Sequence, residues 1–223
     1  MKSNTLPYLF IDFDSTITRV EALDVLAEML YGHVDEEKKR IQDIAEITRQ
    51  AMEGLLPFDQ ALQKRVELLQ LNASAIHSLV QILQNKISQS FLENRTWIKQ
   101  HANRIFILSG GFKEFIIPIA SEFDIAPEHV IANEFEYNHD GVVIGFNSNL
   151  LLSRASGKVL WMKEQQFDMP CDVLGDGFTD YEIRQAGLCR NFYLFTENVR
   201  RESLVGLADR EISHLNQLIE IWK

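Results

Sequence analysis

Short apolar runs alternate along the chain with segments whose apolar residues recur at helical spacing. This alternation is typical of parallel strands joined by crossover helices. The hydrophobic pattern therefore predicts an α/β fold with a parallel, Rossmann-like sheet. The predicted strands are residues 7–13 (PYLFIDF), 104–109 (RIFILS), 129–133 (HVIAN), 171–176 (CDVLGD) and 191–196 (NFYLFT).

Residues 134–146 show a different pattern, in which apolar and polar positions alternate with a two-residue period. The alternation runs on both sides of Asp140 and Gly141, a pair that favours a tight turn. This segment is predicted to be a β-hairpin flap.

The interval from Glu21 to Lys99 contains no convincing strand pattern. Apolar residues recur at helical spacing in residues 21–31, 41–52, 58–69 and 75–83. A stretch of this length is too long for a plain crossover between two strands. We therefore expect a helical-bundle cap, residues 19–99, inserted into an α/β core made of residues 1–18 and 100–223.

Composition narrows the class of protein. The chain has 223 residues, of which 46% are hydrophobic and 24% charged, enough apolar material for one core with a sizeable insertion. Its net charge of -10 argues against nucleic acid or an anionic membrane as a partner, because both are bound through clustered Lys and Arg. Two cysteines make neither a disulfide framework nor a metal site, and no apolar run approaches a membrane span. We expect a cytoplasmic monomer or homodimer.

Polar residues stand where three predicted strands stop: Asp12, Ser109 and Asp176. The carboxyl ends of parallel strands meet at one edge of a sheet, where ligands bind. Asp12 and Asp14 are only two residues apart, so their negative charges repel each other. A bound cation is the first candidate to compensate this repulsion. Each position alone is a weak signal, since an Asp after a strand can be a helix cap and Gly110-Gly111 can be a turn.

The motifs DFDST (12–16), SGG (109–111) and GDGFTD (175–180), in this order, resemble the signatures of the haloacid dehalogenase-like phosphatases. Residues 20–69 resemble the cap of the phosphoserine phosphatase branch. The resemblance implies that Asp12 is the nucleophile and forms a phospho-aspartate, and that Asp14 is the general acid and base. It implies that Ser109, Gly110 and Gly111 hold the phosphoryl group. It also implies Mg²⁺ bound by Asp12, Asp176 and the carbonyl of Asp14, with Asp180 behind these ligands.

The chemistry of these residues agrees with that reading. Phosphate monoesters hydrolyse very slowly unaided, so a reaction split into two steps through a covalent intermediate is favourable. An aspartate is already ionised at pH 7 and needs no base to act as a nucleophile, but it must approach a phosphate dianion. A shared Mg²⁺ removes that repulsion.

The resemblance also assigns the substrate contacts. Glu21 corresponds to a ligand of the substrate ammonium, and Arg65 to the residue that clamps the carboxylate. Met52 and Phe58 correspond to residues that close over the substrate, and Thr179 is expected to approach it. Spacing alone leaves Arg65 open as a solvated residue and Met52 and Phe58 open as helical core.

The implied function is a Mg²⁺-dependent phosphomonoester hydrolase acting on O-phosphoserine or a similar small phosphorylated metabolite, as in serine biosynthesis. Two alternatives remain open at this stage. One is a phosphotransferase to another alcohol, and the other is a degenerate protein that binds a phosphorylated ligand with weak turnover.

The family's third motif, a Lys beside the nucleophile, has no direct match. Aligned on residues 157–159 (GKV), the expected position is Ser156, with Arg154 and Lys158 two residues to either side. We predict that Lys158 takes this role, because it has a long flexible stem and follows the permissive Gly157. The bulky fork of Arg154 is harder to fit beside the nucleophile.

Overall fold

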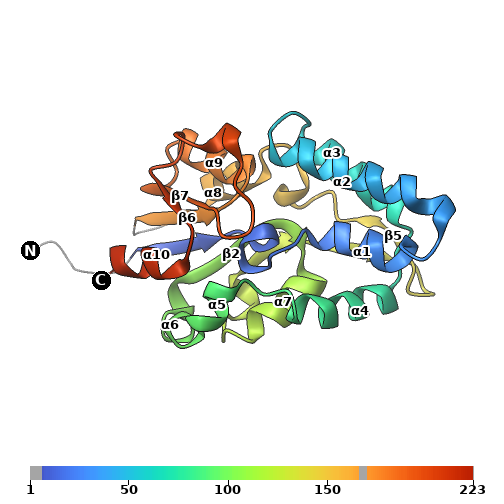
Figure 1. The fold of residues 1–223 in the computed structure, drawn as a ribbon, viewed down its shortest axis with the longest axis horizontal. Coiled ribbons are helices and arrows are strands. Elements are labelled where there is room, and N and C mark those ends of the chain that lie inside the picture. The colour runs from blue at the N-terminus through green and yellow to red at the C-terminus, as the bar shows by residue number, and fades with distance from the viewer. Residues whose placement is uncertain (1–6, 166–169, 223) are drawn as a thin grey trace, which may run out of the picture.

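The structure, a computed structural model, describes residues 7–165 and 170–222. Residues 1–6, 166–169 and 223 of the predicted core lie outside this range. A six-stranded sheet of order β3-β2-β1-β6-β7-β8 forms the centre, and every neighbouring pair is parallel (Figure 1). Its strands are β1 (Tyr8–Ile11), β2 (Ile105–Phe112), β3 (Val130–Asn133), β6 (Cys171–Gly175), β7 (Asn191–Phe195) and β8 (Arg210–Ile212). The predicted parallel α/β architecture is confirmed.

The strand order reverses at β1, the central strand. Ile11 is in register with Ile107 of β2 on one side and with Leu174 of β6 on the other, and the later strands follow outward in both directions. The point where strand order reverses leaves a crevice at the carboxyl edge, in which ligands bind. Asp12, the residue after β1, lies at that point.

The two faces of the sheet bury separate hydrophobic cores, because successive side chains of a strand point to opposite faces. Leu9 and Ile11 belong to one core and Phe10 to the other. The first core lies under α4 (Ala73–Gln84), α5 (Gln89–Glu93), α6 (Arg95–Gln100), α7 (Lys113–Ser121) and α10 (Leu215–Ile221). The second lies under α8 (Gly157–Glu164) and α9 (Phe178–Gln185), on the opposite side of the sheet (Figure 1).

The predicted helices of residues 21–99 are present. In the described structure this stretch contributes no strand beyond isolated bridges at Asn72 and Ile87. Helices α1 (Ala22–Tyr31), α2 (Lys38–Met52) and α3 (Phe58–Leu69) pack against one another, α4 packs on both α1 and α7, and α5 packs on α10 (Figure 1). The division of the chain at residues 18 and 100 stays a prediction. Over the described range, none of the helices combines the length and the apolar character needed to cross a membrane.

The predicted flap is a two-stranded antiparallel hairpin of β4 (Phe135–Tyr137) and β5 (Val143–Phe146). Gly141 forms its turn with a φ of +75°, a conformation that glycine adopts without strain. The hairpin is tied to the start of α4, because Ala73 N donates to Gly141 O at 3.0 Å.

Two strand ends differ from the predicted ones. β1 stops at Ile11, and residues Phe13–Ile17 form an irregular turn, in which Asp14 and Ser15 have non-helical backbone angles. β2 continues past Ser109 to Phe112, but Leu108 pairs with Ile131 and Phe112 with Asn133, so three residues bulge opposite one. Ser109 therefore lies in a bulge within the strand rather than after it.

Strand β8 was not predicted. It has three residues, and two of them, Arg210 and Glu211, are exposed and charged. Such an edge strand carries no apolar run, and only its pairing with β7 defines it.

Candidate active site

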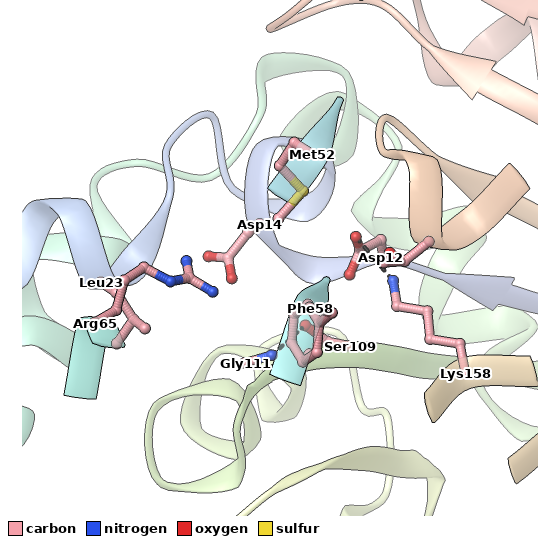
Figure 2. Close-up of a pocket in the computed structure, with 11 residues that line it drawn as sticks. Asp12, Asp14, Leu23, Met52, Phe58, Arg65, Ser109, Gly111 and Lys158 are labelled. Atoms are coloured by element: carbon pink, nitrogen blue, oxygen red, sulfur yellow. Dashed lines mark hydrogen bonds and ion pairs between the residues drawn. The ribbon is translucent and has the colours of Figure 1, made fainter. Parts of the chain in front are cut away.

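A small cavity lies at the carboxyl edge of the sheet, under α1–α3 (Figure 2). It encloses about 20 Å³, room for one water molecule, and the side chains of Met52 and Phe58 are among those that line it. A substrate can therefore enter only if some of the lining side chains move. The cavity is lined by Asp12, Asp14, Leu23, Met52, Phe58, Arg65, Ser109, Gly110, Gly111, Lys158 and Thr179.

Asp12 and Lys158 form a buried ion pair. The Asp12 carboxylate accepts a bond from Phe13 N at 2.7 Å through Oδ1, and Oδ2 lies 3.0 Å from Lys158 Nζ (Figure 2). Lys158 Nζ also donates to Asp180 Oδ1 at 2.8 Å. Burial alone lowers the pKa of Lys158, but Asp12 and Asp180 outweigh it and raise the pKa above its ordinary value. The ammonium is therefore held charged against Asp12.

Neither alternative position supplies this charge. Ser156 donates its hydroxyl to Glu182 at 2.7 Å, and exposed Arg154 donates to Asn149 O at 3.3 Å. A Cβ on Gly157 would lie 2.3 Å from Leu151 O, so only glycine lets α8 begin this close to the preceding turn. Lys158 lies where the prediction put it, and its catalytic role stays a prediction.

Asp14 lies on the other side of the cavity. Its Oδ1 accepts a bond from Ala22 N at 2.8 Å, and the guanidinium of Arg65 points toward its carboxylate (Figure 2). Burial raises the pKa of Asp14 to about 7, with the bond from Ala22 opposing and the charge of Asp12 adding to the rise. A carboxyl group with a pKa near neutrality can both give and take a proton, as a general acid and base must.

Three buried carboxylates converge below the cavity. Asp12, Asp176 and Asp180 each place one oxygen within 4.8 Å of the others. Burial raises the pKa of Asp176 to about 7 and also raises that of Asp180, while the charges of Arg201 and Lys158, respectively, oppose these rises. Hard anionic oxygens in this arrangement fit the ligand preference of Mg²⁺. Asp180 shares this group of oxygens while it accepts bonds from Lys158 Nζ and Gly177 N, and its place behind the ligands stays a prediction.

The bulge of β2 forms the wall opposite Lys158. Ser109 Oγ accepts a bond from Gly111 N at 3.0 Å, and the side chain of Ser109 is only 1% exposed. A Cβ on Gly110 would lie 2.3 Å from Phe58 Cζ, so any side chain there would displace the Phe58 ring from this position. Helix α7 begins at Lys113, directly behind this wall as predicted.

The predicted substrate contacts from α2, α3 and α9 lie around the same cavity. Arg65 is 4% exposed and donates to Thr48 Oγ1 at 3.3 Å, so it is not on a solvated face. Met52, Phe58 and Thr179 also line the cavity, and Arg65 points into it (Figure 2). Their contact with a substrate stays a prediction.

Glu21 lies apart from these residues. Of the described residues, it is not among those that line the cavity. Its Oε1 accepts the hydroxyl of Ser15 at 2.6 Å and lies 3.6 Å from Arg201 Nη2. Burial, with Asp14 and Asp24 nearby, raises the pKa of Glu21 to about 8. Its assignment to a substrate ammonium stays a prediction, and this conformation does not bring it to the cavity.

The family model of the haloacid dehalogenase-like hydrolases matches residues 9–183. The chain belongs to this family. The match runs from β1 into α9. It includes the DFDST, SGG and GDGFTD motifs, the cavity and the carboxylate cluster.

Curated relatives of this haloacid dehalogenase-like hydrolase are phosphoserine phosphatases. The chloroplastic enzyme of Arabidopsis thaliana is 29% identical over 211 residues, covering 93% of this chain and 69% of the plant protein. The Bos taurus enzyme is 29% identical over 212 residues, covering 93% of this chain and 89% of its own. The prediction of an enzyme similar to the phosphoserine phosphatases is confirmed at this level.

Solved structures agree on the fold. A phosphoserine phosphohydrolase-like protein from Francisella tularensis superimposes with a TM-score of 0.87 at 23% identity, over 98% of this chain and 100% of that one. A phosphoserine phosphatase described as a phospho-aspartyl intermediate analogue gives a TM-score of 0.73 at 24% identity, over 98% and 100%. The predicted haloacid dehalogenase-type core is confirmed.

Two residues of this hydrolase that sequence reasoning missed follow β7. Arg201 donates from Nε and Nη2 to Asp176 Oδ2, at 2.9 and 2.6 Å, and Asn198 Nδ2 donates to Ser15 O at 3.0 Å. They tie the segment after β7 to the acidic cluster and to the turn after β1. The signal was available, because the predicted strand 191–196 ends at the same sheet edge, but its polar residues come several positions later.

Proposed function

We propose that the chain is a Mg²⁺-dependent phosphomonoester hydrolase that acts through a phospho-aspartate on Asp12, with O-phosphoserine or a similar small phosphorylated metabolite as substrate. One observation carries the proposal. Asp12, paired with a buried ammonium, shares a cavity with Asp14, whose pKa is about 7. A nucleophile and a proton donor of this kind suit the two half-reactions of phosphoryl transfer. The phosphoserine phosphatase relatives support the choice of substrate.

In the first half-reaction, the Asp12 carboxylate attacks phosphorus and the bond between phosphorus and the ester oxygen breaks. Protonated Asp14 gives its proton to the leaving alkoxide, which departs as the alcohol. Lys158 remains beside Asp12 and offsets the charge of the entering phosphate. Ser109 and the amide of Gly111 lie on the opposite wall, where they suit the equatorial oxygens.

In the second half-reaction, ionised Asp14 takes a proton from a water molecule as the water oxygen attacks phosphorus. The acyl phosphate bond breaks, which releases inorganic phosphate and restores the Asp12 carboxylate. Asp14 is then protonated again, ready for another substrate. Mg²⁺ held by Asp12 and Asp176, with Asp180 beside them, would supply the charge that lets an anionic nucleophile meet a phosphate dianion.

Removal of the metal is expected to inactivate the enzyme reversibly. Excess chelator should lower turnover at least about tenfold, because the carboxylate cluster then repels the phosphate. Mg²⁺ should restore turnover and Ca²⁺ should not, since Ca²⁺ prefers more and looser oxygen ligands. The measurement is phosphate release with each metal, together with the unfolding temperature of wild type and Asp176→Asn. Mg²⁺ should raise that temperature only in the wild type, and full turnover in chelator would contradict the assignment.

Substrate recognition is expected to depend on Arg65. The Arg65→Ala substitution should raise KM for phosphoserine about 30-fold, near 2 kcal/mol, because the substrate carboxylate loses its buried partner. It should change KM much less for a small aryl phosphate, which has no carboxylate. Arg49→Ala is the matched control, since Arg49 is a half-exposed cap arginine paired with Glu46 and Glu53. Equal losses on both substrates would mean that Arg65 is structural or that phosphoserine is not the substrate.

A screen of phosphorylated metabolites with Mg²⁺ tests the function itself. The assay follows free phosphate and any phosphorylated acceptor in the same sample. Free phosphate from phosphoserine supports the proposal, and a phosphorylated acceptor would indicate a transferase instead. Stoichiometric binding without turnover would indicate a binding protein.

A further inference from the structure

The bulge of β2 interrupts its ladder with β3. Residues 109–111 stand opposite the single residue Ala132 of β3, so the ladder cannot satisfy all of their backbone groups. Buried backbone carbonyls are nevertheless almost always hydrogen-bonded. The carbonyl of Gly110 is bonded by a side chain, because Asn133 Nδ2 donates to it at 2.9 Å.

Asn133 is the last residue of β3 and is fully buried. Its Nδ2 donates a second bond, at 3.3 Å, to Leu152 O, whereas its Oδ1 has no partner among residues 7–165 and 170–222. The amide orientation is fixed by this arrangement, since the opposite one would set Oδ1 against two carbonyl oxygens. An orphaned buried acceptor is costly, so a residue kept only to fill space would be apolar.

The bond to Gly110 determines where the next amide points. Described peptide bonds are trans, and in a trans peptide the C=O and the following N–H point in opposite directions. With the Gly110 carbonyl held by Asn133, the N–H of Gly111 is directed at Ser109 Oγ, on the cavity wall. Asn133 therefore orients a donor of the wall that faces the phosphate.

The bond to Leu152 reaches the opposite wall. Leu152 belongs to the turn Leu151–Ser153, and a Cβ on Gly157 would lie 2.8 Å from Leu152 Cα, so this turn fixes the start of α8. Gly110, Leu152, Gly157 and Lys158 also border one small cavity beside the active one. One amide group thus joins the bulge of Ser109 to the turn that seats Lys158.

We propose that Asn133 is a positioning residue for phosphoryl transfer, which sets the orientation of the Gly110–Gly111 peptide and its spacing from Lys158. The inference rests on the proposed function, since it assumes that this wall receives a phosphoryl group. Asn133 does not touch the substrate. It acts through the Gly111 amide and through the turn Leu151–Ser153, which positions Lys158. The Gly111 amide and the Lys158 ammonium both lie where charge develops on the transferring oxygens.

The test replaces Asn133 with leucine, which branches at Cγ as asparagine does but is larger and has no donor. In Asn133→Leu, kcat on p-nitrophenyl phosphate should fall about 10- to 100-fold, because displaced donors stabilise the transition state less well. KM should change less than about threefold, since the same donors matter less to the ground state. Orthovanadate, which takes the five-coordinate geometry of the transition state, should lose affinity by the same factor as kcat.

The matched control is Asn191→Leu. Asn191 Nδ2 donates to Asp172 Oδ1 at 2.8 Å at the start of β7, the end of the sheet remote from the cavity. The unfolding temperature of Asn191→Leu should fall by as much as that of Asn133→Leu. Its kcat and vanadate affinity should equal those of the wild type. If Asn133→Leu does not fold, Asn133→Ser supplies the readout, because one short hydroxyl cannot bridge both carbonyls.

The outcomes separate cleanly. A kcat within about twofold of wild type in a folded Asn133 variant, or equal losses in Asn191→Leu, would overturn the positioning role. Because p-nitrophenyl phosphate reports any phosphomonoesterase, failure of the wild type on phosphoserine alone would overturn the proposed substrate and leave the Asn133 result standing.

Discussion

Asp12→Asn should abolish turnover, with kcat at least about 10⁴-fold below that of the wild type, on the scale of losing a covalent nucleophile. The amide has nearly the same shape as the carboxylate and can keep the bond from Phe13 N, but it has no anionic oxygen to attack phosphorus. Substrate binding should persist, since Ser109, Gly111 and Arg65 are untouched. Acid-quenched enzyme should contain a base-labile phosphoryl adduct only when Asp12 is present.

Asp14→Asn is the informative comparison, because it removes the proton donor and leaves the nucleophile. With an aryl phosphate, whose leaving group needs no proton, this variant should form the adduct and fail to hydrolyse it. The phosphoenzyme should then accumulate and be found by mass spectrometry on Asp12. Recovery of an adduct from Asp12→Asn would assign the nucleophile to another residue.

Lys158→Ala should reduce kcat by about 10²- to 10³-fold, the loss typical of one electrostatic donor in an enclosed site. Lys158 is 5% exposed and lies between Asp12 and Asp180, so its removal leaves two buried carboxylates without their cation. An incoming phosphate dianion then meets uncompensated charge. The measurement is kcat and the rate of phosphoenzyme formation in a rapid-quench experiment.

The expected effect is specific to this cation. Arg154→Ala should stay near wild type, because Arg154 is exposed and its side chain bonds to the carbonyl of Asn149 and not to the carboxylates of the site. Thermal unfolding of Lys158→Met distinguishes lost catalysis from lost structure, since the methionine stem can fill the same channel. A near-normal Lys158→Ala together with a sharp gain in Ser156→Lys would mean that the site is short of one cation and that the enzyme is weakened.

The order of elements could be predicted from the sequence because each depends on local periodicity. Apolar runs gave five of the six strands of the sheet, and an Asp-Gly turn gave the hairpin. Helical spacing gave α1–α4. Strand β8 could not be found in this way, because two of its three residues are charged and only its neighbour β7 makes it a strand.

Part of the site could also be predicted from the sequence. The residues at the ends of the first, second and fourth predicted strands converge because parallel strands place their carboxyl ends at one edge. Asn133 stands at the end of the third predicted strand and follows the same rule. It was missed, although it is a polar residue where an apolar run stops. Arg201 lies further from its strand and offers a weaker signal.

The sequence favoured Lys158 as the cation beside Asp12 only through its flexible stem and the preceding Gly157, and tertiary structure decided how it is directed there and how the carboxylates are shared. Three basic or vacant positions, Arg154, Ser156 and Lys158, lie within five residues, and spacing cannot rank them; the close packing of Gly157 on the turn Leu151–Ser153 directs Lys158 inward. Likewise, Asp180 joins the cluster and Glu21 turns to Ser15, outside the cavity. These outcomes depend on burial and on partners distant in the chain, because the energy of a charge depends on its surroundings and not on its place in a motif.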